Sequence, residues 1–85
     1  MEYLIAVFTS RSQTLLYSNL LKGIGVPNAV ISTPQEVAKA CGISVKFSRA
    51  YLNDAKVALQ NRRLCAFKGF YLVSLRSGRM IITPV

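Results

Sequence analysis

The sequence predicts an α+β fold in which two helices cover one face of a small β-sheet. Short apolar runs alternate along the chain with segments of helical periodicity, and turns rich in glycine, proline and serine separate them. Of the 85 residues, 52% are hydrophobic and 16% are charged, which is enough apolar material for one core. We therefore expect a single domain over residues 1–85.

The first strand is expected at residues 3–8, where the apolar run YLIAVF ends at a polar segment. A helix should follow, because Ser10 and Gln13 have the spacing of a capping box. Gly25 should end this helix with a left-handed turn. The apolar stripe that would lie on the sheet recurs at helical spacing. It consists of Leu16, Leu20 and Ile24, with Leu21 alongside.

A second strand is expected at residues 29–31, followed by a short helix. Residues 33–36, TPQE, combine a capping hydroxyl, a proline at the first helical position and a carboxylate that can return to the cap. The short helix should run to about Cys41 and stop at Gly42. Alternating apolar residues then predict a third strand at residues 43–47.

A third helix should begin at the cap residue Ser48 and end near Arg63. Residues 64–75 are apolar again and predict a fourth strand, and residues 77–78 form a turn before a return strand at residues 80–83. This order of elements predicts a ferredoxin-like βαββαβ sandwich. A short extra helix would precede its third strand, and a C-terminal strand could extend its sheet.

The charge composition favours anionic partners. Eleven Lys and Arg against three Asp and Glu give a formal net charge of +8, which suits nucleic acid, an acidic protein surface or a phosphate-bearing ligand. The sequence contains no histidine, so a histidine-based catalytic triad is excluded. Its few carboxylates are far apart and its two cysteines cannot form a four-ligand zinc site. We expect no cofactor, no metal and no independent catalytic turnover.

The apolar runs are too short to cross a membrane. None approaches the roughly 18 residues that a transmembrane helix needs. The first apolar run follows Glu2 rather than the basic segment of a signal peptide. We expect a cytoplasmic protein with no membrane partner.

Cys41 can be interpreted in two ways from the residue pattern. As a packing residue it would share a helical face with Val37, because free cysteine often behaves as a small buried hydrophobe. As a reactive thiol it would lie at a tight turn with Gly42, where Lys39 and Lys46 could stabilise the thiolate. The carboxyl end of the predicted short helix would oppose that charge. The spacing alone leaves both interpretations open.

A resemblance favours the second interpretation. The N-terminal strand and helix ending in Gly-Ile-Gly-Val-Pro, followed by TPQEVAKACGISVKF, resemble the selenium/sulfur (Se/S) carrier protein-like family over residues 3–73. The most specific part is Pro34 and Glu36, followed by Cys41 and Gly42 before an apolar strand. Residues 74–85 are a C-terminal extension beyond this pattern.

The resemblance implies that Cys41 carries sulfur or selenium as a persulfide or selenopersulfide. A cysteine desulfurase-like donor would load the thiol, and an acceptor protein or enzyme would receive the cargo. Gly42 would leave room beside the sulfur. Lys39 and Lys46 could attract an acidic donor or stabilise the persulfide anion. Cys65 continues an apolar run and is expected to pack in the core.

Two alternatives remain from the sequence. Residues 68–75, KGFYLVSL, partly match the RNA-recognition signature, so the protein could be a small basic RNA-binding module, although this segment lies on the fourth predicted strand rather than the third. Nearby aromatic and basic residues could assist, namely Phe70, Tyr71, Lys68, Arg76 and Arg79. A structural module that forms homo-oligomers by adding residues 80–85 to a partner's sheet is the third reading.

Overall fold

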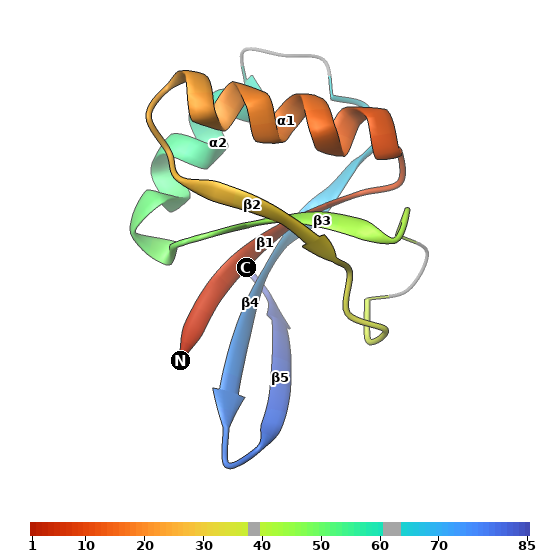
Figure 1. Cartoon of the computed structure of the whole chain (residues 1–85), viewed down its shortest axis with the longest axis vertical. Helices are drawn as coiled ribbons and strands as arrows, with labels where there is room; N and C mark the ends of the chain where they lie inside the picture. Colours follow the sequence, from red (N-terminus) through yellow and green to blue (C-terminus); the bar gives the residue numbers. More distant parts are fainter. Residues whose placement is uncertain (38–39, 61–63) are drawn as a thin grey trace.

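The computed structural model describes residues 1–37, 40–60 and 64–85. In Figure 1 two helices lie over one face of a five-stranded antiparallel sheet, which confirms the predicted α+β ferredoxin-like class. The elements follow in the order β1 (Glu2–Phe8), α1 (Arg11–Gly23), β2 (Asn28–Ser32), β3 (Ile43–Phe47), the 3₁₀ helix η1 (Arg49–Tyr51), α2 (Leu52–Gln60), β4 (Phe67–Arg76) and β5 (Arg79–Pro84).

The strand order across the sheet is β2-β3-β1-β4-β5. β3 lies between β1 and β2, so the first βαβ unit is split by a later strand, as the ferredoxin-like arrangement requires. β5 continues the same sheet beyond β4 through a tight hairpin. Both central residues of that turn have positive φ, 49° at Ser77 and 75° at Gly78, as a type I′ turn needs. The predicted C-terminal strand is confirmed.

The predicted short helix after β2 is wrong for the described residues. Residues 34–37 form a single turn in which the Val37 N–H donates to the Pro34 carbonyl at 3.0 Å. Thr33, the expected helix cap, instead continues the ladder, because its N–H donates to the Gly42 carbonyl at 2.9 Å. Its hydroxyl oxygen lies 2.6 Å from the Ser44 hydroxyl. The N–H and hydroxyl of Thr33, which would have capped a helix, are therefore bonded to residues beside and within β3.

The predicted buried stripe of α1 is correct for Leu21, which is buried, and for Leu20, which packs against the core, but it is wrong for its other two residues. Leu16 is 48% exposed and Ile24 is 55% exposed. The face that packs on the sheet is more polar and consists of Thr14, Tyr17, Ser18 and Leu21. Tyr17 can be buried because its hydroxyl donates to the Ala55 carbonyl of α2 at 2.6 Å. Burial raises the pKa of Tyr17 well above its ordinary value, so it stays protonated.

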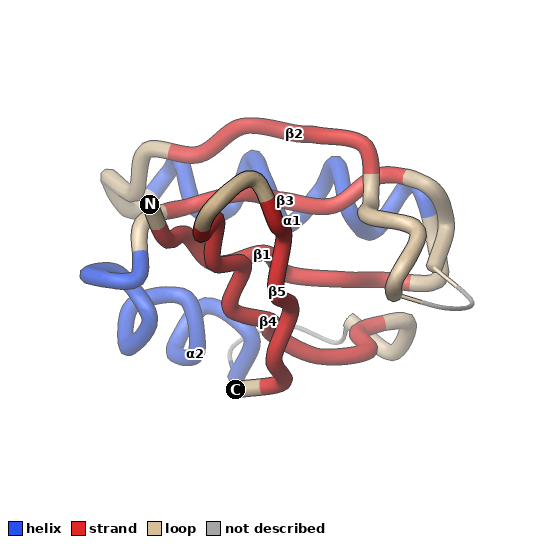
Figure 2. Tube along the Cα trace, turned by 90° about the horizontal axis from the view of Figure 1, so that it is seen from below, coloured by secondary structure: helices blue, strands red, loops and turns tan. Residues whose placement is uncertain are grey.

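The sheet has two apolar faces of unequal size. Under the helices lies the main core, which includes Leu4, Ala6, Phe8, Tyr17, Leu21, Val26, Val45, Phe47, Ala55 and Phe70. Figure 2 views the molecule from the side opposite the helices. There, a smaller cluster is formed by Ile5, Val7, Val37 and Val73, with Tyr3, Ile31, Tyr71 and Ile82 partly buried against it. No helix in the described part of the chain is long and apolar enough to span a membrane.

Candidate functional site

Cys41 lies immediately before β3, and the backbone on both sides of it is fixed. Its own N–H donates to the Phe8 carbonyl of β1 at 3.1 Å, whereas the carbonyl of Gly42 accepts from the N–H of Thr33 beside β2. Gly42 has φ of +97°, a left-handed conformation that side-chain-bearing residues rarely adopt. The predicted tight turn at Gly42 is therefore present, although residues 34–37 and 40–41, the described part of the segment before it, form no helix.

Cys41 is a half-buried residue with a free thiol, and its sulfur reaches the first turn of α1. Sγ lies 3.4 Å from Thr14 Oγ1 and 3.3 Å from the Ile43 carbonyl oxygen, to which the thiol can donate. The Thr14 hydroxyl donates to the Ser10 carbonyl at 2.9 Å. That hydroxyl can rotate and donate to sulfur instead when sulfur carries a negative charge.

The position beside α1 reverses the expected electrostatics. Sequence reasoning placed Cys41 at the carboxyl end of a short helix, where partial negative charge opposes a thiolate. The structure places Sγ beside Thr14 in the first turn of α1, a 13-residue helix. Ser10 caps this helix, and its Oγ accepts from the Gln13 N–H at 3.2 Å. The amino end of a helix carries partial positive charge and stabilises anions. The helix end beside Cys41 is therefore the amino end of α1 rather than the carboxyl end of a short helix.

The structure does not bring Lys46 to the thiol. Lys46 Nζ lies 4.4 Å from the centroid of the Tyr3 ring, on the sheet face opposite α1. Cys41 Sγ contacts α1, so the two side chains occupy opposite faces of the sheet. Lys39 lies outside the described residues. Binding of a donor or persulfide by these two lysines stays a prediction.

Cys65 is exposed, and the expectation that it packs in the core is wrong. The Gln13 side chain holds it: Nε2 donates to Cys65 Sγ at 3.4 Å, while Oε1 accepts from the Ala66 N–H at 2.9 Å. Gln13 was expected to complete the capping box of α1, but it instead ties α1 to the segment that leads into β4. Leu64, not Cys65, fills the core at this point.

The two free cysteines flank the end of β1 from opposite sides. Cys41 pairs with the backbone of Phe8 on the β3 side, and Ala66 pairs with Thr9 on the β4 side. This arrangement separates their backbones by about two strand spacings, roughly 9–10 Å. A disulfide needs Cα atoms within about 7 Å, so Cys41 and Cys65 are not placed to form one.

Thr14 and Gln13 are the site residues that sequence reasoning missed. Each contacts a cysteine more than 25 positions away, and only the folded sheet brings the partners together. Gln13 was assigned a local capping role, and Thr14 had no assigned role. No local pattern in the sequence signals either contact.

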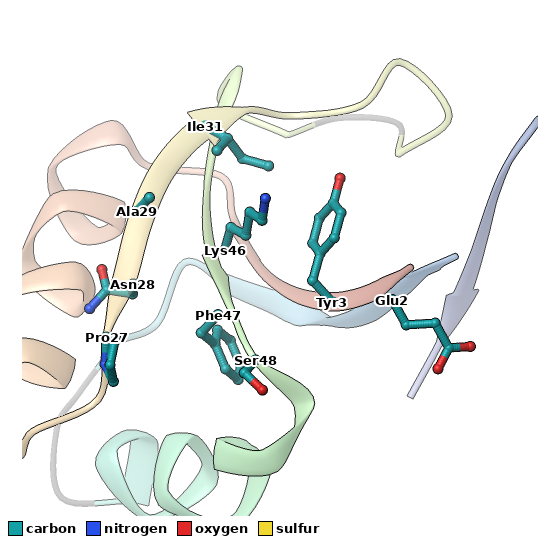
Figure 3. A pocket seen from close by; sticks show the side chains of 9 residues that line it. All are labelled: Glu2, Tyr3, Pro27, Asn28, Ala29, Ile31, Lys46, Phe47 and Ser48. Atoms are coloured by element: carbon teal, nitrogen blue, oxygen red, sulfur yellow. The ribbon is translucent and has the colours of Figure 1, made fainter. Parts of the chain in front are cut away.

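A shallow groove lies on the sheet beside β2, away from Cys41. It has a volume of about 410 Å³, and Figure 3 shows that Tyr3, Lys46 and Ile31 point toward one another there. A neighbouring groove of about 520 Å³ shares Tyr3 and Ile31 and reaches Met80 of β5. Cys41 lines neither groove, so the thiol and the grooves are separate features.

The RNA-recognition alternative lacks free stacking groups. Phe70 is only 7% exposed and packs edge-to-face against Phe47, with ring centroids 5.9 Å apart. Tyr71 lies on the other face, half-buried beside the smaller apolar cluster. Base stacking needs exposed aromatic faces. The described residues thus give the RNA interpretation no support.

Comparison with known families agrees with the resemblance. Residues 3–71 match the model of the family described as "Putative Se/S carrier protein-like". The chain belongs to this family. The Se/S carrier match includes β1 to the middle of β4, and therefore both cysteines, and it leaves β5 outside. No curated protein and no solved structure matches the chain.

Proposed function

We propose that this Se/S carrier family member carries sulfur or selenium on Cys41. The Cys41 thiolate attacks the outer sulfur of a persulfide on a cysteine desulfurase-like donor. The sulfur–sulfur bond of the donor breaks, a Cys41 persulfide forms, and the donor leaves as a thiolate. An acceptor protein or enzyme then takes the outer sulfur in the same type of exchange, which restores the Cys41 thiol.

The contact of the Cys41 sulfur with Thr14, at the amino end of α1, is the observation that carries this proposal. A persulfide is an anion when it leaves or attacks, and the positive end of the helix together with the Thr14 hydroxyl stabilises that charge. Nothing lies within 4 Å of the position that a Cβ would occupy at Gly42, so the turn beside the sulfur is open. The geometry thus combines access with charge stabilisation.

The proposed reaction explains why the chain can lack acid–base residues. The donor enzyme performs the difficult cleavage of carbon from sulfur, and the carrier only exchanges a sulfur atom between thiolates. Such an exchange needs no histidine, metal or organic cofactor in the carrier. A reducing cytoplasm would keep Cys41 and Cys65 as free thiols, and we place the protein there.

Intact-mass spectrometry tests the proposal. The reduced protein is incubated with a cysteine desulfurase and L-cysteine, and the wild type is compared with Cys41→Ser and Cys65→Ser. We expect one added sulfur atom on the wild type and on Cys65→Ser, and none on Cys41→Ser. An unmodified wild type, or equal addition to Cys41→Ser, would overturn the proposal.

A further inference from the structure

The outer edge of β2 exposes unpaired backbone groups. Within residues 1–37, 40–60 and 64–85, β2 pairs only with β3, in an antiparallel register that places Val30 opposite Val45. The Thr33 N–H donates to the Gly42 carbonyl, and hydrogen-bonded positions alternate along an antiparallel ladder. The N–H and C=O groups of Asn28, Val30 and Ser32 therefore point away from β3, along the free edge.

The β2 edge lacks the features that usually prevent strands from pairing with another chain. Its sequence NAVIS contains no charged residue, no proline and no register shift against β3. The other sheet edge differs, because β5 carries Arg79 and Pro84 at its ends. The uncharged segment extends over residues 23–35, in a chain whose net charge is +8.

Exposed apolar side chains border the same edge. Val30 is 39% exposed at the centre of β2. Leu15 of α1 is 42% exposed and lies one turn before Ser18, whose hydroxyl donates to Asn28 of β2 at 2.6 Å. Free backbone groups and an apolar border together suit an added β-strand.

We propose that β2 pairs antiparallel with β2 of a second copy of this chain, with the two Val30 residues opposite each other. A twofold axis through this pair makes every contact occur twice, so Asn28 of each copy faces Ser32 of the other. The outward groups of Val30 then form the reciprocal hydrogen bonds of an antiparallel pair. The absence of charge in β2 allows two strongly basic molecules to meet here without like charges within the paired strands.

Charges near the edge give the dimer a specific salt dependence. Arg11 and Lys22 lie at the two ends of α1, on the same side as Leu15 by helical spacing. In the dimer, Arg11 of one copy approaches Lys22 of the other, and the net charges also repel. Added salt screens this repulsion, so dimerisation strengthens as the salt concentration rises. Association through bound nucleic acid would weaken instead.

The dimer goes beyond the proposed sulfur transfer and is independent of it. The Cys41 N–H bonds to β1, on the inner side of the sheet, whereas the proposed contact uses the outer side of β2. The two Cys41 residues of a dimer would face opposite ends of the joined sheet. Loss of the dimer therefore leaves sulfur loading intact, and loss of Cys41 leaves the dimer intact.

Sedimentation velocity on nucleic-acid-free protein tests the interface, at several protein and salt concentrations. Wild type should form a dimer that tightens with salt. Val30→Lys places two like charges opposite each other and should raise the dissociation constant by about tenfold or more. The matched variant Ile81→Lys alters a 48% exposed position on β5 and should dimerise like the wild type. A monomeric wild type, or a stronger effect of Ile81→Lys than of Val30→Lys, would overturn the proposal.

Amide hydrogen exchange provides a test that needs no substitution. The N–H groups of Val30 and Ser32 should exchange more slowly as the protein concentration rises, because they bond to the second copy. The Ile31 N–H faces β3 within the ladder and should be protected at every concentration. Equal and concentration-independent exchange at Val30 would contradict the interface, even if Val30→Lys failed to fold.

Discussion

Cys41 and Cys65 each precede a strand that borders β1, but their surroundings differ. Cys41 is half-buried, with its backbone bonded to β1 and its sulfur against Thr14 and a carbonyl group. Cys65 is exposed, and its sulfur accepts a hydrogen bond from the Gln13 side chain. Exposure alone would favour Cys65 as the reactive thiol, whereas a fixed position beside a charge-stabilising helix end favours Cys41. The two cysteines therefore differ in access and in positioning, and the proposed carrier role of Cys41 depends on its positioning.

Thiol labelling should separate the two cysteines most clearly. With a small aromatic disulfide reagent, we expect the labelling to show two phases. The faster phase should be the labelling of exposed Cys65, at a rate about tenfold or more above that of Cys41. Cys65→Ser should remove the fast phase, and Cys41→Ser should remove the slow one. A single phase of equal rates, measured by stopped-flow absorbance, would show that the two environments do not differ.

Substitution of Gln13 should affect the Cys65 side only. Gln13→Ala leaves the Ala66 N–H without its acceptor, so we expect a loss of about 1–3 kcal/mol in the free energy of unfolding. The labelling rate of Cys65 should change, while sulfur loading at Cys41 should persist. Thr14→Val is the matched variant for the other side.

Thr14→Val keeps the shape of the side chain but removes the hydroxyl beside Cys41. The free energy of unfolding should fall by a smaller amount, about 1 kcal/mol. Sulfur loading at Cys41 should be slower, and the labelling rate of Cys65 should not change. Denaturant unfolding and the loading assay measure both effects. If either variant changed the reactivity of both cysteines equally, the two thiol environments would not be independent.

Substitution of Gly42 should have a modest effect on stability. Gly42→Ala puts a side chain at φ of +97° and should cost about 1–2 kcal/mol, together with slower loading at the neighbouring Cys41. Gly23→Ala is its control, because Gly23 ends α1 in open space without positive φ, and should stabilise the protein by about 0.5 kcal/mol. Thermal unfolding checks both values, and a neutral Gly42→Ala would show that the turn is not constrained.

Regular patterns made most of the fold predictable. The third strand has the predicted bounds at residues 43–47, and the turn at residues 77–78 is where glycine and serine placed it. These features depend on alternation and turn chemistry, which act over a few residues. The order of elements was then enough to give the α+β class.

The errors arose where distant partners decide the outcome. The short helix before β3 failed because Thr33 pairs with Gly42 and Ser44, which are remote in sequence. Leu16 and Ile24 of the predicted α1 stripe are exposed, because the buried face instead includes Tyr17, whose hydroxyl finds a carbonyl partner in α2. Local propensity cannot represent such long-range hydrogen bonds.

The candidate site was predictable only in part. The order of Cys41 and Gly42 before an apolar strand identified the thiol through its resemblance to a family, and the structure supplies the turn. Its contact with the amino end of α1 and the exposure of Cys65 could not be derived, because β1 brings these segments together. The sequence therefore indicated which atom could react but gave the wrong helix end beside it.

Peptide mapping of loaded wild-type protein tests the central claim most directly, because no residue is changed. Trypsin should release Cys41 in the peptide ACGISVK and Cys65 in LCAFK. After incubation with a cysteine desulfurase and isotopically labelled L-cysteine, persulfides are alkylated and both peptides are quantified by mass spectrometry. We predict labelled sulfur on the Cys41 peptide and none on the Cys65 peptide. Label confined to the Cys65 peptide would contradict the assignment of Cys41 as the carrier thiol.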